Sequence, residues 1–387
     1  MKTGRHFLFV PGPTNVPERV LRAMDRAMVD HRSSAFPELP QAIFPNLLKV
    51  FGSANGQAFV FAGSGSAMWE ASIVNALSPG DRVLAVRNGQ FSTLFIDTAQ
   101  RLGLKVEILD VEWGDAAPAA KIGEMLAADT RHEYKALLIV HNETATGVTS
   151  DVGAIRKAMD DAIHPALLYV DGVSSVASLD FRFDEWKVDF AIAGSQKGFM
   201  VPPGIGMLCV SKKALGLLEH AKCPRAFFDL RDQLKHNADG YFPYTPPVAH
   251  LFGLRESLEM LLEQGMANVA ARHHRLGEGV RRAIAAWGLK LVARDPKSYS
   301  DTVSAIVVPD GADAKKVIDI AFRKYDLSLG AGTGRLVGKV FRIGHVGDLN
   351  ELMVLGALCG VEMALNDAGI PVTLGSGVAA AQQWFRA

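Results

Sequence analysis

Short apolar runs alternate with helical patterns along the first half of the chain. Each run has four or five residues and is mostly continuous rather than alternating, which is typical of strands buried on both faces of a largely parallel sheet. The runs span residues 58–62, 83–86, 106–109, 136–140, 167–170, 190–193 and 207–210. The repeated succession of strand and helix predicts a three-layer α/β domain with a mostly parallel sheet.

Helical periodicity fills the gaps between these runs. Residues 66–77 carry apolar side chains at four-residue steps, Trp69 among them. Residues 151–163 form an amphipathic pattern, which Ser150 is expected to cap. Each of these helices is therefore expected to pack one apolar face against the sheet.

The pattern changes near Gly240. A proline-rich segment, residues 240–247, precedes a long helical stretch over 248–287, with a break expected at Gly265. The remainder predicts an α+β arrangement, with strands at 303–308 and 340–343 and helices at 314–324 and 349–366. We therefore expect three parts: an N-terminal arm and substrate loop over residues 1–20, a large domain over 21–270 and a small C-terminal domain over 271–387.

Composition narrows the classes of partner. The chain has 41 lysine and arginine residues against 41 aspartate and glutamate residues, so neither nucleic acid nor an anionic membrane is expected as its main partner. Cys209, Cys223 and Cys359 form no CxxC pair, which favours a reducing, cytoplasmic setting. The weakly polar stretch 352–361 is too short to span a membrane, and the N-terminal apolar run stops at Pro11, too short for a signal peptide.

A glycine- and serine-rich loop follows the first predicted strand, at the edge where ligands of open α/β sheets collect. Gly63-Ser64-Gly65-Ser66 opens a helix, whose free N–H groups and dipole suit a phosphate; the alternative is a tight strand–helix turn. The loop is not a dinucleotide-binding fingerprint, because Met68 stands where the third glycine would be.

A carboxylate and a lysine follow two further strands. Asp171 comes after residues 167–170, where the alternative is a helix cap or a turn aspartate, and Lys197 comes after 190–193, where the commoner reading is a surface lysine. Together with the loop they suggest pyridoxal phosphate, which needs a phosphate cradle, a carboxylate for its ring nitrogen and a lysine for its covalent link. That lysine must lose its proton, and desolvation would lower its pKa from about 10.4.

Further motifs extend from about residue 9 to beyond residue 347. They are Phe9-Val10-Pro11-Gly12-Pro13-Thr14-Asn15-Val16-Pro17, Asp30-His31-Arg32-Ser33, His141-Asn142-Glu143-Thr144-Ala145-Thr146-Gly147, Leu254-Arg255-Glu256-Ser257 and Phe341-Arg342-Ile343-Gly344-His345. With the segments around Asp171 and Lys197, they resemble the class V branch of the fold-type I aminotransferases. The resemblance implies a large α/β/α domain with a smaller α+β C-terminal domain, the cofactor pyridoxal 5'-phosphate, and a homodimer or higher assembly that shares its active site between subunits.

The resemblance also implies roles for individual residues. Lys197 would bond the cofactor and then move the proton of the substrate Cα, and Asp171 would pair with the ring nitrogen. The phosphate contacts would come from Ser64, Gly65, Ser66 and Gln196, and from Thr245 with Tyr244 or Tyr241 of the partner subunit.

Other positions of the family concern the cofactor ring and the substrate. Phe91 would stack on the ring, with a core phenylalanine as the alternative, and Thr144 would lie near the phenolic oxygen. Arg342 would bind the substrate α-carboxylate through two nitrogens of its guanidinium, with a surface arginine as the alternative. Backbone groups of the loop with Gly12 and Pro13 would close over the substrate.

The implied reaction is transamination from L-serine to glyoxylate, giving hydroxypyruvate and glycine in two ping-pong half-reactions. Alanine or aspartate are the alternative donors, since Arg32 and Arg87 have no assigned role. More distant alternatives are a lyase or desulfurase, for which Cys223 is the candidate loop cysteine, and a nicotinamide-dependent dehydrogenase, against which the missing third glycine argues. No metal site is expected, because His273 and His274 lack the spacing of zinc ligands.

Overall fold

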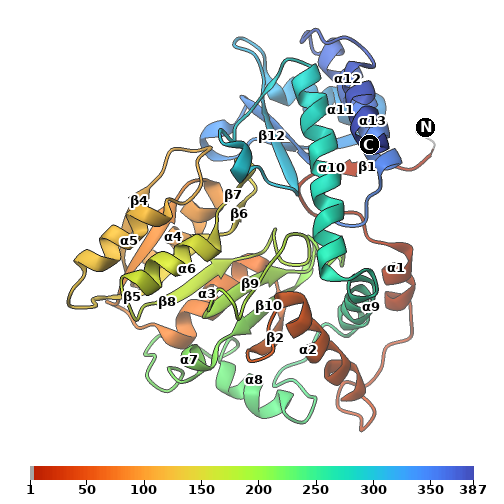
Figure 1. Ribbon diagram of the computed structural model, residues 1–387. Coiled ribbons are helices and arrows are strands. Elements are labelled where there is room, and N and C mark those ends of the chain that lie inside the picture. The colour runs from red at the N-terminus through yellow and green to blue at the C-terminus, as the bar shows by residue number, and fades with distance from the viewer. Residues whose placement is uncertain (1–3) are drawn as a thin grey trace.

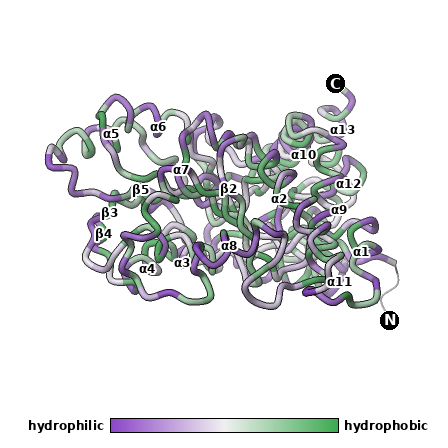
Figure 2. The backbone as a smooth tube through the Cα atoms, turned by 90° about the horizontal axis from the view of Figure 1, so that it is seen from below, coloured by the Kyte–Doolittle hydropathy of each residue, from purple (hydrophilic) through white to green (hydrophobic). Residues whose placement is uncertain are grey.

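This computed structural model describes residues 4–387, so the first three residues of the predicted N-terminal arm lie outside the described part. Figure 1 shows a larger group of elements around a seven-stranded sheet and a smaller group above it, in blue, with α10 (Met266–Ala286) running from one to the other. Figure 2 shows hydrophobic segments, in green, along interior strands such as β2, and hydrophilic segments, in purple, along many outer loops.

The larger sheet has the strand order β2-β10-β9-β8-β5-β3-β4. Its strands are β2 (Gln57–Gly63), β3 (Arg82–Arg87), β4 (Lys105–Asp110), β5 (Tyr134–Val140), β8 (Leu167–Asp171), β9 (Phe190–Gly194) and β10 (Gly204–Val210). Neighbouring strands are parallel except at β10, which runs antiparallel to β2 and β9. All seven predicted strands and the mostly parallel sheet are therefore confirmed.

Helices cover both faces of this sheet, and the strands send alternate side chains into two cores. Val60 and Leu84 point into one core with α2, α5, α6 and α9, whereas Phe59 and Val83 point into the other with α3, α4 and α8. The helices are α2 (Glu38–Phe51), α3 (Gly65–Ala76), α4 (Gln90–Arg101), α5 (Ala119–Ala128), α6 (Val152–Asp161), α7 (Lys212–Leu215), α8 (Leu230–Asn237) and α9 (Val248–Gln264). The predicted three-layer α/β architecture is confirmed.

The predicted cap of α6 is wrong by one residue. Asp151, not Ser150, is the N-cap, because its Oδ1 accepts a hydrogen bond from the N–H of Ala154 at 2.8 Å. The Ser150 hydroxyl instead accepts from the N–H of Ala117 at 3.1 Å. Serine and aspartate both cap helices well. The position of the cap therefore depends on where the chain enters the helix after the short hairpin of β6 (Asn142–Glu143) and β7 (Val148–Thr149).

The smaller sheet has the order β1-β13-β14-β12-β11 and includes a strand from the N-terminus. The strands are β1 (Phe7–Phe9), β11 (Lys290–Leu291), β12 (Val303–Val307), β13 (Leu327–Ala331) and β14 (Val340–Gly344), and its helices are α10, α11 (Ala314–Tyr325), α12 (Glu351–Asp367) and α13 (Ser376–Arg386). Short 3₁₀ turns lie at η1 (Pro296–Ser298) and η2 (Gly334–Leu336). β1 pairs in parallel with β13, Phe7 opposite Leu327.

The N-terminal segment touches both groups of elements. After β1, α1 (Glu18–Met24) lies against α9, and Arg19 forms ion pairs with Glu256 and Glu263 at 2.7 Å. The break predicted at Gly265 is confirmed, since its φ of 80° separates α9 from α10. The predicted division at residues 20 and 270 stays a prediction, and its second boundary falls inside α10.

Within residues 4–387, no helix combines the length and the hydropathy that a membrane span requires.

Candidate active site

A cavity of about 300 Å³ opens at the carboxyl ends of the parallel strands. It is lined by Gly12, Pro13, Ser64, Gly65, Ser66, Trp69, Phe91, Val140, Asn142, Thr144, Asp171, Val173, Ser174, Gln196, Lys197 and Pro203. Segments far apart in the sequence therefore meet here, and they bring together every predicted site residue except Arg342, Tyr244 and Thr245. The roles of these residues stay predictions.

The start of α3 forms the end of the cavity that suits an anion. Ser64 is the N-cap, and its Oγ accepts from the N–H of Ala67 at 3.4 Å. Ser64 and Ser66 are exposed, whereas Gly65 is buried so closely against Val173 that a Cβ would overlap that side chain. The first N–H groups of a helix have no carbonyl partner within it. With the two hydroxyls and the helix dipole, they fit a phosphate group.

Gln196 adds an unsatisfied polar group to this cavity. Its Oε1 is buried and has no hydrogen-bond partner among the described residues. An unpaired buried polar group costs about 1–3 kcal/mol, so a ligand that bonds this amide would be stabilised. A half turn of the amide presents its NH₂ group, which can donate to a phosphate oxygen. The donor set therefore fits a phosphorylated cofactor.

Asp171 ends β8 and is held by two hydrogen bonds. Oδ1 accepts from the N–H of Val173 at 2.9 Å, and Oδ2 accepts from the indole N–H of Trp69 at 3.0 Å. The residue is 4% exposed, and burial raises its pKa to about 6, while the two hydrogen bonds act in the opposite direction. At pH 7 it is therefore mostly a carboxylate, which can stabilise a protonated ring nitrogen.

Lys197 follows β9 and is buried beside the N-terminal loop. Its Nζ donates to the carbonyl of Pro11. Burial lowers the pKa of this amine to about 8; the charge of Arg342 also lowers it, and the charge of Asp171 raises it. A substantial share of the side chain is thus neutral near pH 8 and able to accept a proton.

The loop with Gly12 and Pro13 closes against this lysine. A Cβ at Gly12 would overlap the Lys197 side chain, and the φ of +114° at Gly12 also favours glycine. Just after the loop, the N–H of Thr14 donates to the Gln196 carbonyl at 3.0 Å, and its hydroxyl donates to the Val346 carbonyl at 2.6 Å. The loop is therefore fixed between the two groups of elements.

Phe91 lies at the start of α4, on the cavity wall, and a buried glutamate anchors that helix end. Glu143 accepts from the N–H of Ser92 at 2.9 Å and from the N–H of Ala145 at 3.1 Å. Burial raises its pKa. Glu143 thus joins the α4 end, which carries Phe91, to the turn that carries Thr144. Sequence reasoning gave it no role, and its place three residues after the buried strand β5 was the available signal.

Arg342 lies behind Thr144 rather than in the cavity lining. It is 8% exposed, and its Nη1 and Nε donate to the carbonyls of Thr144 and Ala331, both at 2.9 Å. Burial lowers its pKa to about 10. Three of its five N–H groups remain without a partner among the described residues. The guanidinium is therefore positioned by backbone groups and keeps donors for a carboxylate.

Tyr244 and Thr245 lie outside this cavity. Both are exposed, and the Tyr244 ring stacks on Phe227 with centroids 5.2 Å apart. Tyr241 is turned inward, and its hydroxyl donates to the Ser33 carbonyl at 3.2 Å. Of the two tyrosines left open by the sequence, Tyr244 is therefore the one with its ring at the surface.

Trp69, Asn142 and Ser174 also line the cavity and were missed. The Asn142 amide donates to Ser174 Oγ at 2.9 Å and to Thr302 Oγ1 at 2.8 Å, so it connects the cavity wall to the smaller sheet. Trp69 was recognised as an apolar position of α3. The direction of its N–H depends on tertiary packing, which periodicity does not reveal.

Residues 4–387 give no support for a metal site or for a catalytic cysteine in this cavity. No group of three or more potential metal ligands clusters there. Of the cysteines in the described part of the chain, Cys209 and Cys223 are buried and Cys359 is exposed on α12, and none lines the cavity. A cysteine nucleophile for desulfurisation is thus absent from this cavity as the single chain forms it.

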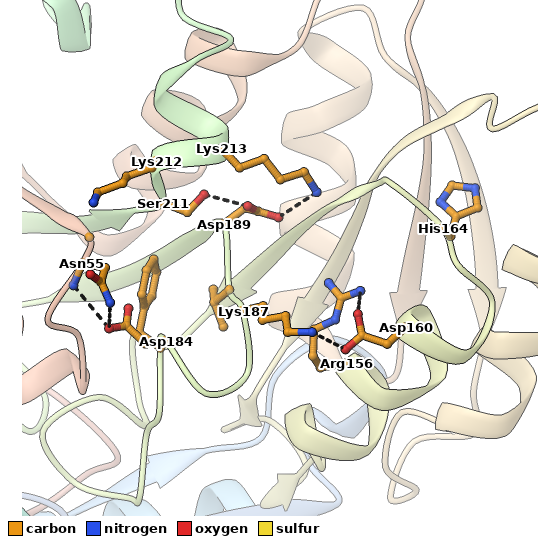
Figure 3. A pocket seen from close by; sticks show the side chains of 13 residues that line it. Asn55, Arg156, Asp160, His164, Asp184, Lys187, Asp189, Ser211, Lys212 and Lys213 are labelled. Atoms are coloured by element: carbon orange, nitrogen blue, oxygen red, sulfur yellow. Dashed lines mark hydrogen bonds and ion pairs between the residues drawn. The ribbon is translucent and has the colours of Figure 1, made fainter.

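A second cavity, of about 440 Å³, opens at the amino ends of the parallel strands (Figure 3). Five of its charged side chains pair with one another: Asp160 with Arg156 at 2.8 Å and with Lys187 at 2.9 Å, and Asp189 with Lys213 at 3.6 Å. None of the predicted site residues lines it. It therefore does not compete with the first cavity as the active site.

Lys197→Met is expected to stabilise the cofactor-free protein at pH 7. Below about pH 8 the folded chain carries a desolvated ammonium group at this position. Between pH 8 and the ordinary lysine pKa, the folded chain loses this proton while the unfolded chain keeps it, so wild-type stability rises with pH. Removing the charge should increase the free energy of unfolding by up to about 3 kcal/mol at pH 7, and by less at pH 9.5.

Urea denaturation of both proteins at the two pH values measures this difference. Lys212→Met is the matched control, because Lys212 is exposed on α7 and should show no gain at either pH. An equal gain for Lys197→Met at pH 7 and pH 9.5 would contradict the charge argument and indicate better packing instead.

Comparison with known proteins gives matches over the whole chain. The family model for Aminotransferase class-V matches residues 6–333. The serine–glyoxylate aminotransferase of Methylorubrum extorquens is 57% identical over 100% of this chain and 97% of that protein. The L-aspartate–glyoxylate aminotransferase of Paracoccus denitrificans is 50% identical over 99% and 97%. Among solved structures, the ureidoglycine–glyoxylate aminotransferase of Bacillus subtilis has a TM-score of 0.92 at 27% identity, over 100% of both chains.

Proposed function

This chain belongs to the class-V aminotransferases, and we propose that it uses pyridoxal 5'-phosphate to transfer the amino group of L-serine to glyoxylate. The products are hydroxypyruvate and glycine, formed in two ping-pong half-reactions. One observation carries the proposal: the anion-binding start of α3, the Asp171 carboxylate and the Lys197 amine line one cavity. The relatives that act on glyoxylate support the choice of substrates.

The residues present fit the cofactor, and each has a chemical task. When bound, pyridoxal phosphate supplies the ring that accepts the electron pair left at the substrate Cα and carries the amino group between the half-reactions. The start of α3 and Gln196 hold its phosphate, and Asp171 stabilises a proton on its ring nitrogen. Phe91 covers the ring and keeps water away from it. Lys197 would hold the cofactor covalently until the substrate's amino group takes its place there, and the released neutral amine would then take the proton from Cα and return it.

Substrate binding falls to Arg342 and the loop at Gly12 and Pro13. The guanidinium binds the α-carboxylate through its remaining N–H groups, which fixes the bond from Cα that is to break. The cavity of about 300 Å³ also has to hold the cofactor, so the space that remains suits a small amino acid. Apart from Lys197, the described lining contains no cationic side chain, and Arg342, which lies behind Thr144, is assigned to the α-carboxylate; with no second cation assigned, serine is favoured over aspartate.

Aspartate is the second candidate donor, because one relative at 50% identity is an L-aspartate–glyoxylate aminotransferase. The two arginines without an assigned role do not line the cavity. Arg87 forms an ion pair with Asp110 at the edge of the sheet, and Arg32 is exposed. A second carboxylate would thus need a cation from outside the described lining, so aspartate belongs in the experiment that tests the donor.

The active site is proposed to be shared in a homodimer or higher assembly in the cytoplasm. The exposed Tyr244 and Thr245 support this, because they lie outside their own chain's cavity and at the surface, where a partner subunit would meet them. All three cysteines are free thiols, which supports a reducing compartment.

The visible absorption of the purified protein tests this function. We expect the yellow band of a lysine-bound cofactor, which bleaches when L-serine is added and returns when glyoxylate follows. Serine donates its amino group in the first step and glyoxylate takes it in the second, so the band reports each half-reaction separately. Parallel additions of L-alanine and L-aspartate compare the donors at equal concentration.

The possible outcomes distinguish an error in the proposed donor from an error in the proposed cofactor. A band that ignores serine but bleaches with aspartate or alanine would keep the aminotransferase and replace the proposed donor. Absence of a band after incubation with pyridoxal phosphate would refute the proposed cofactor.

A further inference from the structure

The two oxygens of Asp171 have donors of different kinds. Oδ1 is bonded by a backbone N–H, that of Val173, whereas Oδ2 is bonded by the side chain of Trp69. Trp69 lies on α3, five residues after the N-cap Ser64, and is 4% exposed. The helix whose start faces the cofactor phosphate therefore also sends a side chain to the carboxylate at the other end of the ring site.

The orientation of Trp69 is fixed by its packing. Its ring stacks on Phe95 of α4, with centroids 5.5 Å apart and planes 19° apart. An indole held in this way aims its single N–H in one direction. Because each oxygen of Asp171 accepts one bond, the carboxylate cannot rotate without losing one of them.

Charge is the second consequence of this contact. Asp171 is buried, and two charged groups face it from neighbouring elements: Glu143 from β6, which disfavours its ionisation, and Lys197 from the segment after β9, which favours it. Burial and the charge of Glu143 both raise the pKa of Asp171 and so disfavour its ionised form. The N–H of Trp69 acts for it, since a donor bonds an anion more strongly than a neutral acid.

We propose that Trp69 is a positioning residue, which holds the Asp171 carboxylate in one orientation and stabilises its negative charge for the protonated ring nitrogen of the cofactor. The inference rests on the proposed function, because the ring nitrogen belongs to pyridoxal phosphate. Phenylalanine could fill nearly the same space as this indole but lacks the donor. The function of Trp69 therefore depends on its indole N–H and not on the size of its side chain.

Trp69→Phe tests this by removing the N–H while keeping an aromatic ring. Pyridoxal phosphate is titrated into the cofactor-free protein, and its dissociation constant is measured between pH 5 and pH 8. We expect binding at pH 7 to weaken by about tenfold, and the pH below which binding is lost to rise by about one unit. If Trp69→Phe does not fold, Trp69→Met takes its place.

Trp287→Phe is the matched control. The indole N–H of Trp287 donates to the buried Glu362 carboxylate at 2.9 Å, in the small group of elements. This variant loses the same type of bond, so it should lower the unfolding temperature yet leave cofactor binding and its pH dependence unchanged.

A double-mutant cycle with Asp171→Asn separates positioning from packing. Asp171→Asn alone should weaken binding, and adding Trp69→Phe should then change it less than twofold, because the charge on which the N–H acts is gone. An unchanged dissociation constant and pH profile for Trp69→Phe would overturn the proposal, as would the same tenfold loss in the Asp171→Asn background. A wild-type protein that binds no pyridoxal phosphate would instead refute the proposed function itself.

Discussion

Lys197→Ala is expected to lose transamination by about 10³-fold or more while the fold stays intact. The amine is removed from the cavity, so no side chain remains to bond the cofactor or to accept the Cα proton there. The loss is hard to replace from within the protein, because the described lining of the cavity contains no other amine: Lys197 is 9% exposed beneath the loop at Gly12. The start of α3 is unchanged, so the variant should still bind pyridoxal phosphate noncovalently.

The rate of hydroxypyruvate formation from L-serine and glyoxylate measures this effect. Lys212→Ala is the control, because it removes an exposed lysine that lies in the second cavity, at the other end of the strands. Normal turnover by Lys197→Ala would refute the assignment. Turnover that is restored by an added small primary amine would support it, since such an amine replaces the missing base in the space left by the side chain.

Arg342→Ala is expected to raise the KM for serine and for glyoxylate together, by about 100-fold, with a smaller effect on kcat. Both substrates carry a carboxylate of the kind that this guanidinium is proposed to bind, and two charge-assisted hydrogen bonds account for a change of that size. Arg342→Lys should recover little, because a lysine cannot bond the carbonyls of Thr144 and Ala331 and a carboxylate with the same geometry.

Steady-state kinetics with each substrate varied in turn provide the test. Arg323→Ala serves as the control, since Arg323 is an exposed residue of α11 paired with Asp319. Thermal unfolding of each variant shows whether loss of the two carbonyl contacts has disturbed the fold. If neither KM changes in a folded Arg342→Ala protein, another group binds the carboxylate.

The larger sheet could be predicted because each of its strands has a signal in its own residues. Continuous apolar runs mark β2, β3, β5, β8, β9 and β10, and the residues just after them gave the proposed phosphate loop, Asp171 and Lys197. Parallel strands end at one edge, so residues that follow them must converge. For this reason most of the candidate cavity could be predicted before its geometry was known.

The rest depends on contacts between distant segments. β1 is three residues long, and its pairing with β13 has no local signal. Trp69 and Asp171 are 102 residues apart, and only the packing of α3 on the sheet brings them together. Glu143 ends the two-residue strand β6 beside a tight turn, where a glutamate is ordinarily exposed, and its burial follows from the docking of α4. Such contacts are properties of the assembled layers rather than of any segment.

The pairing of β1 with β13 sets the order in which the site is completed during synthesis. Phe7 pairs with Leu327, a separation of 327 − 7 = 320 residues, and the Thr14 hydroxyl bonds the Val346 carbonyl, 332 residues later. A ribosome releases this arm first and its partners near the end, so the first strand stays unpaired through most of translation. A nascent chain stopped before β13 would carry Lys197 and Asp171 on the complete seven-stranded sheet, yet it would lack the anchored loop that covers them.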